Sequence, residues 1–432
     1  MRIAIIGTGV SGLLAARLMA SKHDVRVFEA NGYLGGHARM EQVEIAGRRC
    51  VVDTGFMVFN EATYPNFCQL LRLLGIPAQN TDMSFSVRCA RSGLEYQGSS
   101  LNGLFAQRSN LLSPRFYGML RDIIRFNLQA EEILAQPSTI SLGAYLKEQK
   151  YSTAFIEHYL LPMSAAIWSC PPHQVLQFPL FFLVRFLSNH GLLQLRNRPQ
   201  WKTIVGGSQE YIRPLMQPLQ NHIRLNCPIV SVRRNSENVL IQSSDGREES
   251  FDYVIMALHA DQALAVLRDS DALESEILAS FPYHENVAVL HTDHTILPKR
   301  RRSWASWNYH LGTDANRPVS VTYDLGRLQK LNLAKPLLLT LNPTESIRPD
   351  SILKQIKFQH PAYDTTSIAA QQRRLECQGT RRTFFCGAYW GNGFHEDGVN
   401  SALSIAEFFG ITMDACTISS TKDASNIADM TR

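Results

Sequence analysis

The stretch RIAIIGTGVSGLLAARLMASKHDVRVFEA, residues 2–30, decides the fold class of this chain. Its β-branched start predicts a strand, the glycine cluster predicts a tight turn, the aliphatic run after it predicts a helix, and DVRVFEA predicts a second strand. Gly7 permits the turn, Gly9 lets the backbone approach a ligand, and Gly12 lets the helix pack on the strand. Because a helix N-terminus attracts negative charge, this βαβ unit predicts a site for the pyrophosphate of a dinucleotide.

Glu29 ends the second strand of the βαβ unit. A carboxylate at this position can accept hydrogen bonds from both ribose hydroxyls of the nucleotide, whereas it would repel a 2′-phosphate. The pattern therefore favours NAD or FAD and excludes NADP.

A second glycine element, GYLGGHARM at 32–40, follows the acidic residue and separates these two cofactors. Gly35 and Gly36 suit continued backbone contact with a pyrophosphate, Arg39 supplies a cation for it, and an NAD domain usually has no such element. The element therefore favours FAD. The next turn contains Asp53, which either orients this loop or is an ordinary turn aspartate.

The composition limits the remaining classes of protein. With 432 residues the chain exceeds the usual size of one domain, so two interleaved or consecutive domains are expected. The net charge of +5 is modest, and the basic run 299–302 is typical of a solvated loop, so nucleic-acid binding is not expected. The same run can instead attract a carboxylate or phosphate head group.

The eight cysteines include no Cys-x-x-Cys pair, and no histidine pair has metal-ligand spacing, so we expect reduced thiols and no metal site. No secretory pattern precedes the first strand. The most apolar segment, 176–187, contains Pro179 and Arg185 and is too short to span a bilayer. We therefore expect a cytoplasmic protein, with peripheral contact to a membrane left open.

The middle of the chain predicts a helical block followed by strands. Residues 101–200 are mainly of helical character, with apolar residues at helical spacing over 116–134. The aromatic segment 165–193 is either a packed helix pair or the lining of an apolar tunnel. Strands over 287–293, 303–310, 320–325 and 337–343 predict an antiparallel sheet with one covered face. Its aromatic residues Trp304, Trp307 and Tyr309 are candidates either for the core or for a cavity wall.

Several segments together resemble the flavin-dependent amine oxidase superfamily. More narrowly, the chain is similar to a family of NAD/FAD-binding oxidoreductases associated with cyclopropane fatty acid synthases, which also occurs as the N-terminal half of plant versions of that synthase. The segments that carry the resemblance are EANGYLGGHA (29–38), DTGFMVFNEATYPN (53–66), DMSFSV (82–87), LPMSAAIWSCP (161–171), NHGLLQL (189–195), RPQWKTI (198–204), VIMALHADQAL (254–264) and CGAYWGNGFHEDG (386–398).

The resemblance implies an α/β fold in which a Rossmann-like FAD-binding domain of the glutathione-reductase and amine-oxidase type is interleaved with a helical and antiparallel-sheet substrate domain. The implied boundaries are 1–80, 201–265 and 366–412 for the FAD-binding parts, 81–200 and 266–365 for the substrate parts, and 413–432 for a mobile tail. A noncovalent FAD follows from the same resemblance. The residues expected to bind it are Gly7, Gly9, Ser11, Gly12, Glu29, Gly35, Gly36, Arg39, Gly55, Phe56, Val230, Gly387, Phe394, His395 and Gly398.

The C-terminal stretch FFCGAYWGNGFHEDG, 384–398, resembles the late flavin-contacting segment of that superfamily. By this resemblance, Gly387 begins a turn beside the flavin phosphates, and the backbone around Phe394 and His395 meets the isoalloxazine. The positive end of the helix that follows is expected to point at the pyrimidine carbonyl. Glu396 and Asp397 are interpreted as helix caps.

The resemblance also implies a lipid substrate: an acyl chain that is unsaturated, methylated or cyclopropanated, oxidised or desaturated by hydride transfer to flavin N5. A flavin amine oxidase and a noncatalytic flavoprotein that partners a lipid-modifying synthase are the alternatives. Desaturation also needs a base within hydrogen-bond reach of the reacting carbon. The candidates are His395, Tyr389, His259, which is otherwise a helix cap, and His190.

Overall fold

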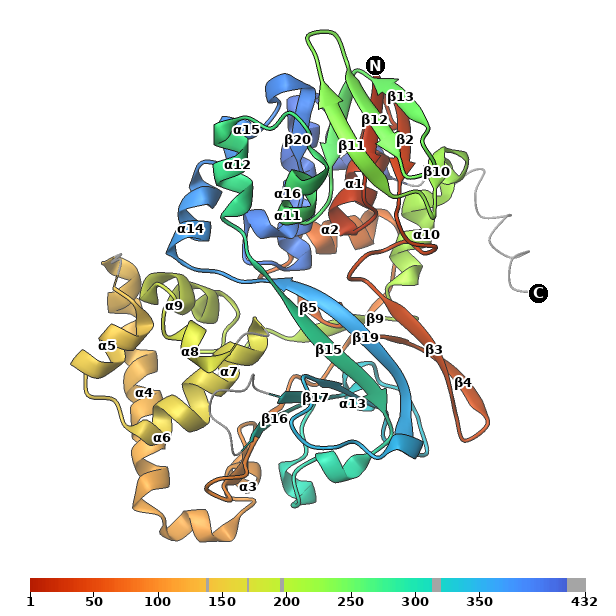
Figure 1. Cartoon of the computed structure of the whole chain (residues 1–432). Coiled ribbons are helices and arrows are strands. Elements are labelled where there is room, and N and C mark those ends of the chain that lie inside the picture. Colours follow the sequence, from red (N-terminus) through yellow and green to blue (C-terminus); the bar gives the residue numbers. More distant parts are fainter. Residues whose placement is uncertain (137–139, 169–170, 195–197, 313–319, 418–432) are drawn as a thin grey trace.

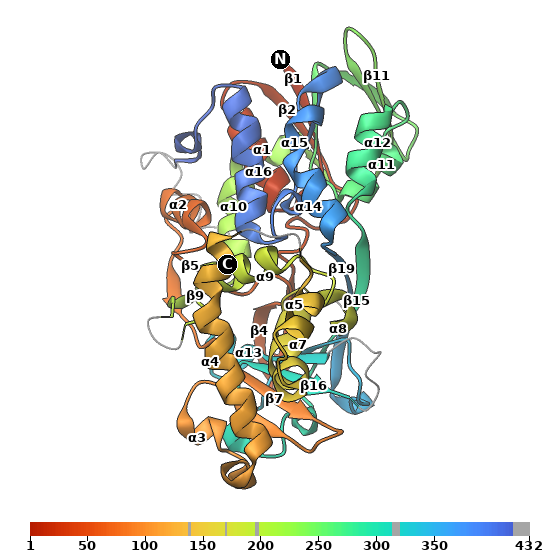
Figure 2. The same ribbon diagram turned by 90° about the vertical axis from the view of Figure 1, so that its left-hand side faces the viewer.

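The computed structural model describes residues 1–136, 140–168, 171–194, 198–312 and 320–417, and Figures 1 and 2 show its two halves. The upper half contains a parallel sheet with its helices, and the lower half contains a larger sheet and a helical block. Two long strands, β15 (Tyr283–His291) and β19 (Ile352–Pro361), pair with each other and run from one half to the other (Figure 1).

The upper sheet is the Rossmann-like part of the fold. Its five strands are all parallel, in the order β10 (Ile223–Arg224), β2 (Asp24–Phe28), β1 (Arg2–Ile6), β14 (Tyr253–Met256) and β20 (Thr383–Phe385). The βαβ unit of the first thirty residues is therefore confirmed, and strands from much later in the chain complete its sheet.

Both faces of this sheet are buried, as the continuous apolar run in β1 requires. Ile3 and Ile5 face one core, and Ala4 and Ile6 face the other, because successive side chains of a strand point to opposite faces. The first core is covered by α1 (Val10–Met19), α2 (Pro65–Leu73), α10 (Gln209–Met216) and α16 (His395–Phe408). The second is covered by the antiparallel strands β11 (Ile229–Arg234), β12 (Val239–Ser243) and β13 (Glu248–Phe251) and by α11 (Ala260–Val266), α12 (Ala272–Ala279) and α15 (Arg374–Cys377).

The lower sheet has seven strands, in the order β19, β15, β18 (Leu338–Leu341), β17 (Ser320–Asp324), β16 (Trp307–Leu311), β7 (Phe85–Cys89) and β8 (Glu95–Gln97). All neighbouring pairs are antiparallel except β16 and β7. The sheet predicted from 287–343 thus exists, and two earlier strands extend it. Smaller ladders join β3 (Met40–Ile45) to β4 (Arg48–Asp53), and β9 (Trp201–Ile204) to β5 (Phe59–Asn60) and β6 (Ala78–Asn80).

A helical block packs on this sheet and shares one core with it. Its longest member is α4 (Pro114–Ala135), where Ser113 accepts a hydrogen bond from the Phe116 amide and Pro114 occupies the first helical position. The other members are α3 (Leu101–Leu104), η1 (Arg108–Leu112), α5 (Leu142–Glu148), α6 (Thr153–Phe155), η2 (Ile156–Leu160), α7 (Leu161–Ile167), α8 (Pro172–Val175) and α9 (Leu180–Asn189). The short helices α13 (Leu325–Leu328) and α14 (Thr365–Gln372) connect strands elsewhere.

The predicted fold class is confirmed: an α/β domain with a parallel sheet, interleaved in the chain with a helical and largely antiparallel part. The segment predicted as a mobile tail begins with η9 (Met413–Cys416), in which Met413 and Cys416 are buried, and from residue 418 it lies outside the described residues. Within the described residues, no helix combines the length and apolar character needed to cross a bilayer.

Candidate functional site

Two cavities meet where the halves join. The glycine-rich cavity, of about 570 Å³, lies in the upper half against residues 7–11, Glu29, Gly35 and Gly387. The aromatic cavity, of about 290 Å³, extends into the lower half between α7, α9 and the seven-stranded sheet. They share a wall that we call the junction, formed by His37, Phe358, His360, Pro361, Gly393, Phe394 and His395.

The first glycine turn forms one wall of the glycine-rich cavity. Gly7 has φ +100°, and a Cβ there would lie 2.3 Å from the Ala257 carbonyl oxygen, so only glycine fits. A Cβ at Gly12 would lie 2.1 Å from the Gly7 carbonyl oxygen, which is the close packing of helix on strand that the fingerprint requires. A Cβ at Gly9, the N-cap of α1, would meet no protein atom within 4 Å. The N-terminus of α1 therefore opens directly onto the cavity.

Glu29 and Arg39 provide opposite charges on this wall. The Glu29 carboxylate is buried and accepts hydrogen bonds from the amide and hydroxyl of Thr8 and from the amide and side-chain nitrogen of Asn31. These four donors occupy its lone-pair sites, so a ribose hydroxyl must replace one of them, and Asn31 is exposed. Arg39 pairs with Glu41, with Nε 2.8 Å from Oε1, and its guanidinium lies over the Tyr33 ring.

The C-terminal stretch forms the opposite wall. Gly387, Phe394 and His395 all line the glycine-rich cavity. Gly398 lies in the first turn of α16 and packs on α1, where a Cβ would lie 2.7 Å from Val10 Cγ1 and 2.8 Å from Ser11 Oγ. The N-terminal ends of α1 and α16 therefore lie side by side at the cavity, and their unpaired amides favour a negatively charged ligand.

The two acidic residues of this stretch are structural, as predicted, but they cap different helices. Asp397 Oδ2 accepts the Phe394 amide at 2.9 Å and caps its own helix, α16. Glu396 instead accepts the amides of Asn66 and Phe67 at 3.0 and 2.9 Å, at the start of α2. Burial raises the pKa of Asp397 to about 7 and raises that of Glu396 as well, while the backbone donors oppose both shifts.

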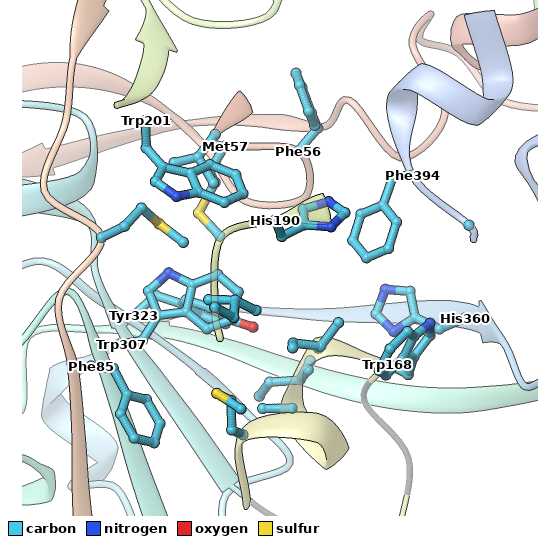
Figure 3. Close-up of a pocket in the computed structure, with 18 of the residues that line it drawn as sticks. Phe56, Met57, Phe85, Trp168, His190, Trp201, Trp307, Tyr323, His360 and Phe394 are labelled. Atoms are coloured by element: carbon cyan, nitrogen blue, oxygen red, sulfur yellow. The ribbon is translucent and has the colours of Figure 1, made fainter. Parts of the chain in front are cut away.

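The aromatic cavity is lined mainly by apolar side chains (Figure 3). Trp168 Nε1, Trp307 Nε1 and Tyr363 Oη belong to this lining and are buried without a hydrogen-bond partner. Among the described lining residues there is no aspartate or glutamate, and Arg198 is the one lysine or arginine. The alternative of a tunnel lining for part of 165–193 therefore gains support, because Ala166, Ile167, Trp168, Phe186, His190 and Leu192 line this cavity.

His395 and His190 are the catalytic candidates that reach the aromatic cavity. His395 stacks on Phe56, with ring centroids 3.5 Å apart and an interplanar angle of 8°, and its Nε2 lies 3.1 Å from the Tyr211 hydroxyl. His190 stacks on Phe186, whose carbonyl lies 2.9 Å from His190 Nδ1. Burial lowers the pKa of His190 to about 4 and holds that of His395 well below its usual value, so both imidazoles are neutral at neutral pH.

His259 and Tyr389 line the glycine-rich cavity and not the aromatic one. His259 is the N-cap residue of α11, stacks on Tyr283 at 4.4 Å, and leaves its buried Nδ1 unpaired. The buried Tyr389 hydroxyl has no partner either, and burial raises its pKa well above its usual value. Both side chains therefore present a free polar atom on the cofactor side of the junction.

The predicted cofactor residues fall into four groups. Gly55 and Phe56 line the aromatic cavity, Gly12 and Gly398 pack helices, and Val230 is 38% exposed while its neighbour Ile229 lines the glycine-rich cavity. The remaining ten line the glycine-rich cavity: Gly7, Gly9, Ser11, Glu29, Gly35, Gly36, Arg39, Gly387, Phe394 and His395.

The sequence prediction missed the part of the junction that comes from His37 and from Phe358–Pro361 at the end of β19. His37 lies inside the second glycine element, so the motif could have predicted that it lies near the cofactor. The end of β19 carried no motif, and only the pairing of β19 with β15 brings it to the cavities. Asp53, whose role was open, accepts the Ser208 amide at 3.0 Å and so orients the start of α10.

A search against protein-family profiles matches residues 10–315 to the flavin-containing amine oxidoreductases. The chain belongs to this family. It is therefore an FAD-dependent oxidoreductase, in agreement with the glycine-rich cavity between two helix N-termini. A search of curated protein sequences gave no significant match.

Several solved structures share the fold. Cyclohexylamine oxidase from Brevibacterium oxydans IH-35A has a TM-score of 0.68 at 15% identity, over 95% of this chain and 99% of that one. Putrescine oxidase bound to putrescine has a TM-score of 0.67 at 14% identity, over 95% and 99% of the two chains. A CLA-producing fatty acid isomerase from P. acnes has a TM-score of 0.65 at 16% identity, over 94% and 98%.

The residues present fit FAD. The open N-terminus of α1 suits the pyrophosphate, Glu29 suits the ribose, and Arg39 supplies a compensating cation. The unpaired His259 Nδ1 and Tyr389 Oη are polar atoms that this cavity leaves for a ligand. Bound FAD supplies hydride acceptance at its N5 atom.

Proposed function

We propose that this flavoenzyme oxidises or desaturates a lipid acyl chain that is unsaturated, methylated or cyclopropanated. The observation that carries the proposal is the absence of a carboxylate among the described residues of the aromatic cavity, together with their apolar, aromatic character. A cationic amine in such a cavity would lose its hydration without gaining a counter-charge, which is strongly unfavourable. A hydrocarbon chain gains free energy from the same burial.

Arg198 gives the proposed substrate an orientation. It is exposed and is the one permanent charge among the described lining residues, so it suits a carboxylate or phosphate at the outer end of an acyl chain. The buried histidines do not compete for such a group, because desolvation keeps His37 and His190 neutral, each with a pKa lowered to about 4.

The chemistry requires two acceptors. FAD held in the glycine-rich cavity would supply acceptance of the hydride from the acyl carbon, and formation of a C–C double bond also releases a proton from the neighbouring carbon. His395 is the base that we favour because it is neutral and lines both cavities. His190 is the alternative base on the substrate side, whereas His259 and Tyr389 lie on the cofactor side and are better suited to hold FAD. A partner that resembles a cyclopropane fatty acid synthase stays a prediction.

The second candidate function is oxidation of an amine that is uncharged when it binds. The family match and the fold shared with putrescine oxidase and cyclohexylamine oxidase favour it. The fold shared with a fatty acid isomerase favours a lipid instead. At these low identities the neighbours support the fold alone, so our preference for a lipid rests on the cavity lining.

Anaerobic reduction of the bound flavin tests the proposal. Purified holoprotein is mixed with unsaturated, methyl-branched and cyclopropane fatty acids, with the corresponding phospholipids, and with putrescine and cyclohexylamine, and flavin absorbance is followed. We expect bleaching with acyl lipids and none with amines. Bleaching by amines alone would establish the second candidate, and no bleaching by any compound would favour the noncatalytic flavoprotein.

An Arg198→Gln variant tests the orientation of the substrate. We expect the free fatty acid to bind at least tenfold more weakly, since about 1.5–3 kcal/mol is typical for a charge-assisted hydrogen bond. Arg247→Gln is the matched control, because Arg247 is a highly exposed arginine in the turn between β12 and β13. Equal behaviour of the two variants would remove Arg198 from the substrate site.

A further inference from the structure

The lower end of the molecule carries an exposed apolar surface on α3, η1 and α4 as far as Leu128. Leu112 is 88% exposed, Leu101 78% and Leu128 75%, which are unusual values for leucine. Figures 1 and 2 show α3 and the start of α4 at the end farthest from the five-stranded sheet. We call this set the terminal surface: Leu101, Leu111, Leu112, Tyr117, Ile124 and Leu128.

Contacts between these segments make the surface continuous. Tyr117, Ile124 and Leu128 lie on one face of α4, because they are spaced by seven and four residues. The Tyr117 hydroxyl donates to the Leu111 carbonyl at 3.2 Å, which joins α4 to η1. Arg108 then joins η1 to α3 through the Asn102 side chain at 2.7 Å.

Positive charge lies beside α3, η1 and the first half of α4. Residues 101–130 include four arginines and one acidic residue, Asp122, whose side chain is fully buried, and the exposed Glu131 and Glu132 follow one turn beyond Leu128. Arg115 and Arg121 are exposed on α4. The helix α3 also packs beside η5 (Arg301–Ser303), which holds part of the basic run 299–302. Apolar side chains framed by arginines are typical of a protein face that lies in the interface of an anionic lipid bilayer.

The aromatic cavity reaches the base of the terminal surface. Gly98 and Ser99 line that cavity, and Leu101 begins α3 two residues later. Arg198, the charged residue of the cavity lining, is exposed to solvent. A lipid that leaves the bilayer beside α3 therefore has a short path into the aromatic cavity.

We propose that the terminal surface docks on an anionic lipid membrane and delivers acyl chains to the aromatic cavity. The delivery step rests on the proposed function, whereas the docking itself does not. The apolar residues enter the interfacial layer, and the arginines contact lipid phosphates. Docking of this kind is peripheral and reversible, and it weakens at high salt because charge contributes to it.

Flotation with lipid vesicles tests the docking without any turnover. Holoprotein is mixed with vesicles of phosphatidylcholine alone or of phosphatidylcholine with phosphatidylglycerol. We expect binding to the anionic vesicles, little binding to the neutral ones, and release in about 1 M salt, where the Debye length falls to about 3 Å. The double variant Leu112→Ser/Leu128→Ser should bind at least tenfold more weakly and keep its fold, since both side chains are exposed.

The matched control is Leu375→Ser/Phe408→Ser, which removes two apolar residues of 80% and 62% exposure from the upper half. Full binding by this control and weak binding by the surface variant would support the proposal. Absence of binding by the wild type, or equal loss in both variants, would overturn it. A dimer that dissociates only in the Leu112→Ser/Leu128→Ser variant would show that a second copy covers the surface instead. Flavin bleaching by soluble fatty acids is scored separately, so docking and the proposed function can fail independently.

A second inference comes from a chain of amide side chains behind the junction. The Val287 amide donates to Asn342 Oδ1 at 3.1 Å, which fixes the orientation of the Asn342 amide. Asn342 Nδ2 therefore donates to Asn286 Oδ1, at 2.6 Å. Asn286 Nδ2 in turn donates to the His284 carbonyl at 3.3 Å and to His360 Nδ1 at 3.0 Å.

We infer that Asn286 is a positioning residue that holds His360 as the tautomer with its proton on Nε2. His360 belongs to the junction, and its ring lies 5.0 Å from that of His37. Because Nδ1 is occupied as an acceptor, the Nε2–H group is the donor that this ring offers to a ligand. At the junction, the neutral His360 ring can therefore donate a hydrogen bond from a fixed Nε2–H group to FAD or to the substrate.

Nitrogen NMR of histidine-labelled protein tests this inference directly, with His360→Gln used to assign the signal. We expect a single Nε2–H tautomer in the wild type and a shift toward Nδ1–H in Asn286→Asp, where a carboxylate accepts from the ring. Flavin affinity and reduction potential should change in Asn286→Asp and not in His173→Gln, a control at an exposed histidine of α8. A wild-type ring with Nδ1 protonated, or an unchanged tautomer in Asn286→Asp, would refute the inference.

Discussion

Replacement of Gly9 by alanine separates the binding of FAD from the stability of the fold. The φ of Gly9 is −63°, which alanine adopts readily, and its Cβ would meet no protein atom within 4 Å. The new methyl group projects into the glycine-rich cavity in front of the α1 amides. We expect it to weaken charge-assisted hydrogen bonds to the pyrophosphate by about 3 kcal/mol, or roughly 100-fold in the Kd for FAD. The free energy of unfolding of the apoprotein should fall by only about 1 kcal/mol, which is the cost of alanine as the poorer N-cap residue.

Fluorescence titration of the apoprotein with FAD measures the affinity, and circular dichroism at increasing urea concentration measures the stability. Gly118→Ala is the matched control, since Gly118 lies within α4 and its Cβ would also meet no atom within 4 Å. This control should keep full affinity for FAD and gain up to about 1 kcal/mol from helix propensity. A folded Gly9→Ala apoprotein with wild-type affinity for FAD would refute the placement of the pyrophosphate at α1.

Three further substitutions test the packing around the site. Folding raises the pKa of Asp397 from 3.8 to about 7, so the wild-type apoprotein loses stability as the pH rises through that range. Asparagine at this position does not titrate, so the stability gained by Asp397→Asn over the wild type should be larger at pH 8 than at pH 4, by up to about 4 kcal/mol. Urea unfolding at both pH values measures this gain, and an equal gain at both would contradict the prediction. Glu396→Ala removes the cap at the Phe67 amide and should cost about 2 kcal/mol in the same assay, with no loss if the cap is unimportant. Arg234→Met removes the nearest cation from the buried Glu274 carboxylate, which keeps the Asp271 amide and a longer ion pair with Arg381, and should cost about 3 kcal/mol; Arg234→Met/Glu274→Leu should recover part of it.

The sequence predicted well those features that depend on neighbouring residues. The strand, turn and helix of residues 2–28 follow from local periodicity and from the steric demands at Gly7 and Gly12. The cap of α16 by Asp397 follows in the same way from a carboxylate three residues into a helix. In each case the interacting residues lie within a few positions of one another, so a single segment of sequence is enough to predict the contact.

The features that were missed depend on contacts between distant segments. Glu396 stands next to Asp397 in the sequence, yet it caps α2, more than three hundred residues earlier in the chain. His360 reaches the junction because β19 pairs with β15 over its whole length, and no pattern within either strand fixes where they end.

The two cavities differ in charge, and the junction is an uncharged wall between them. The glycine-rich cavity holds Glu29, Arg39 and Lys357, whereas the described lining of the aromatic cavity has Arg198 at its exposed end as its one permanent charge. The residues between them are aromatic rings, glycine, proline and neutral imidazoles, and burial keeps those imidazoles uncharged. A polar cofactor and an apolar chain can therefore meet across a wall that brings no charge and little water to the reacting atoms. Hydride transfer benefits from this arrangement, because solvent that reached the same point would compete for the electrons and protons that the reaction moves.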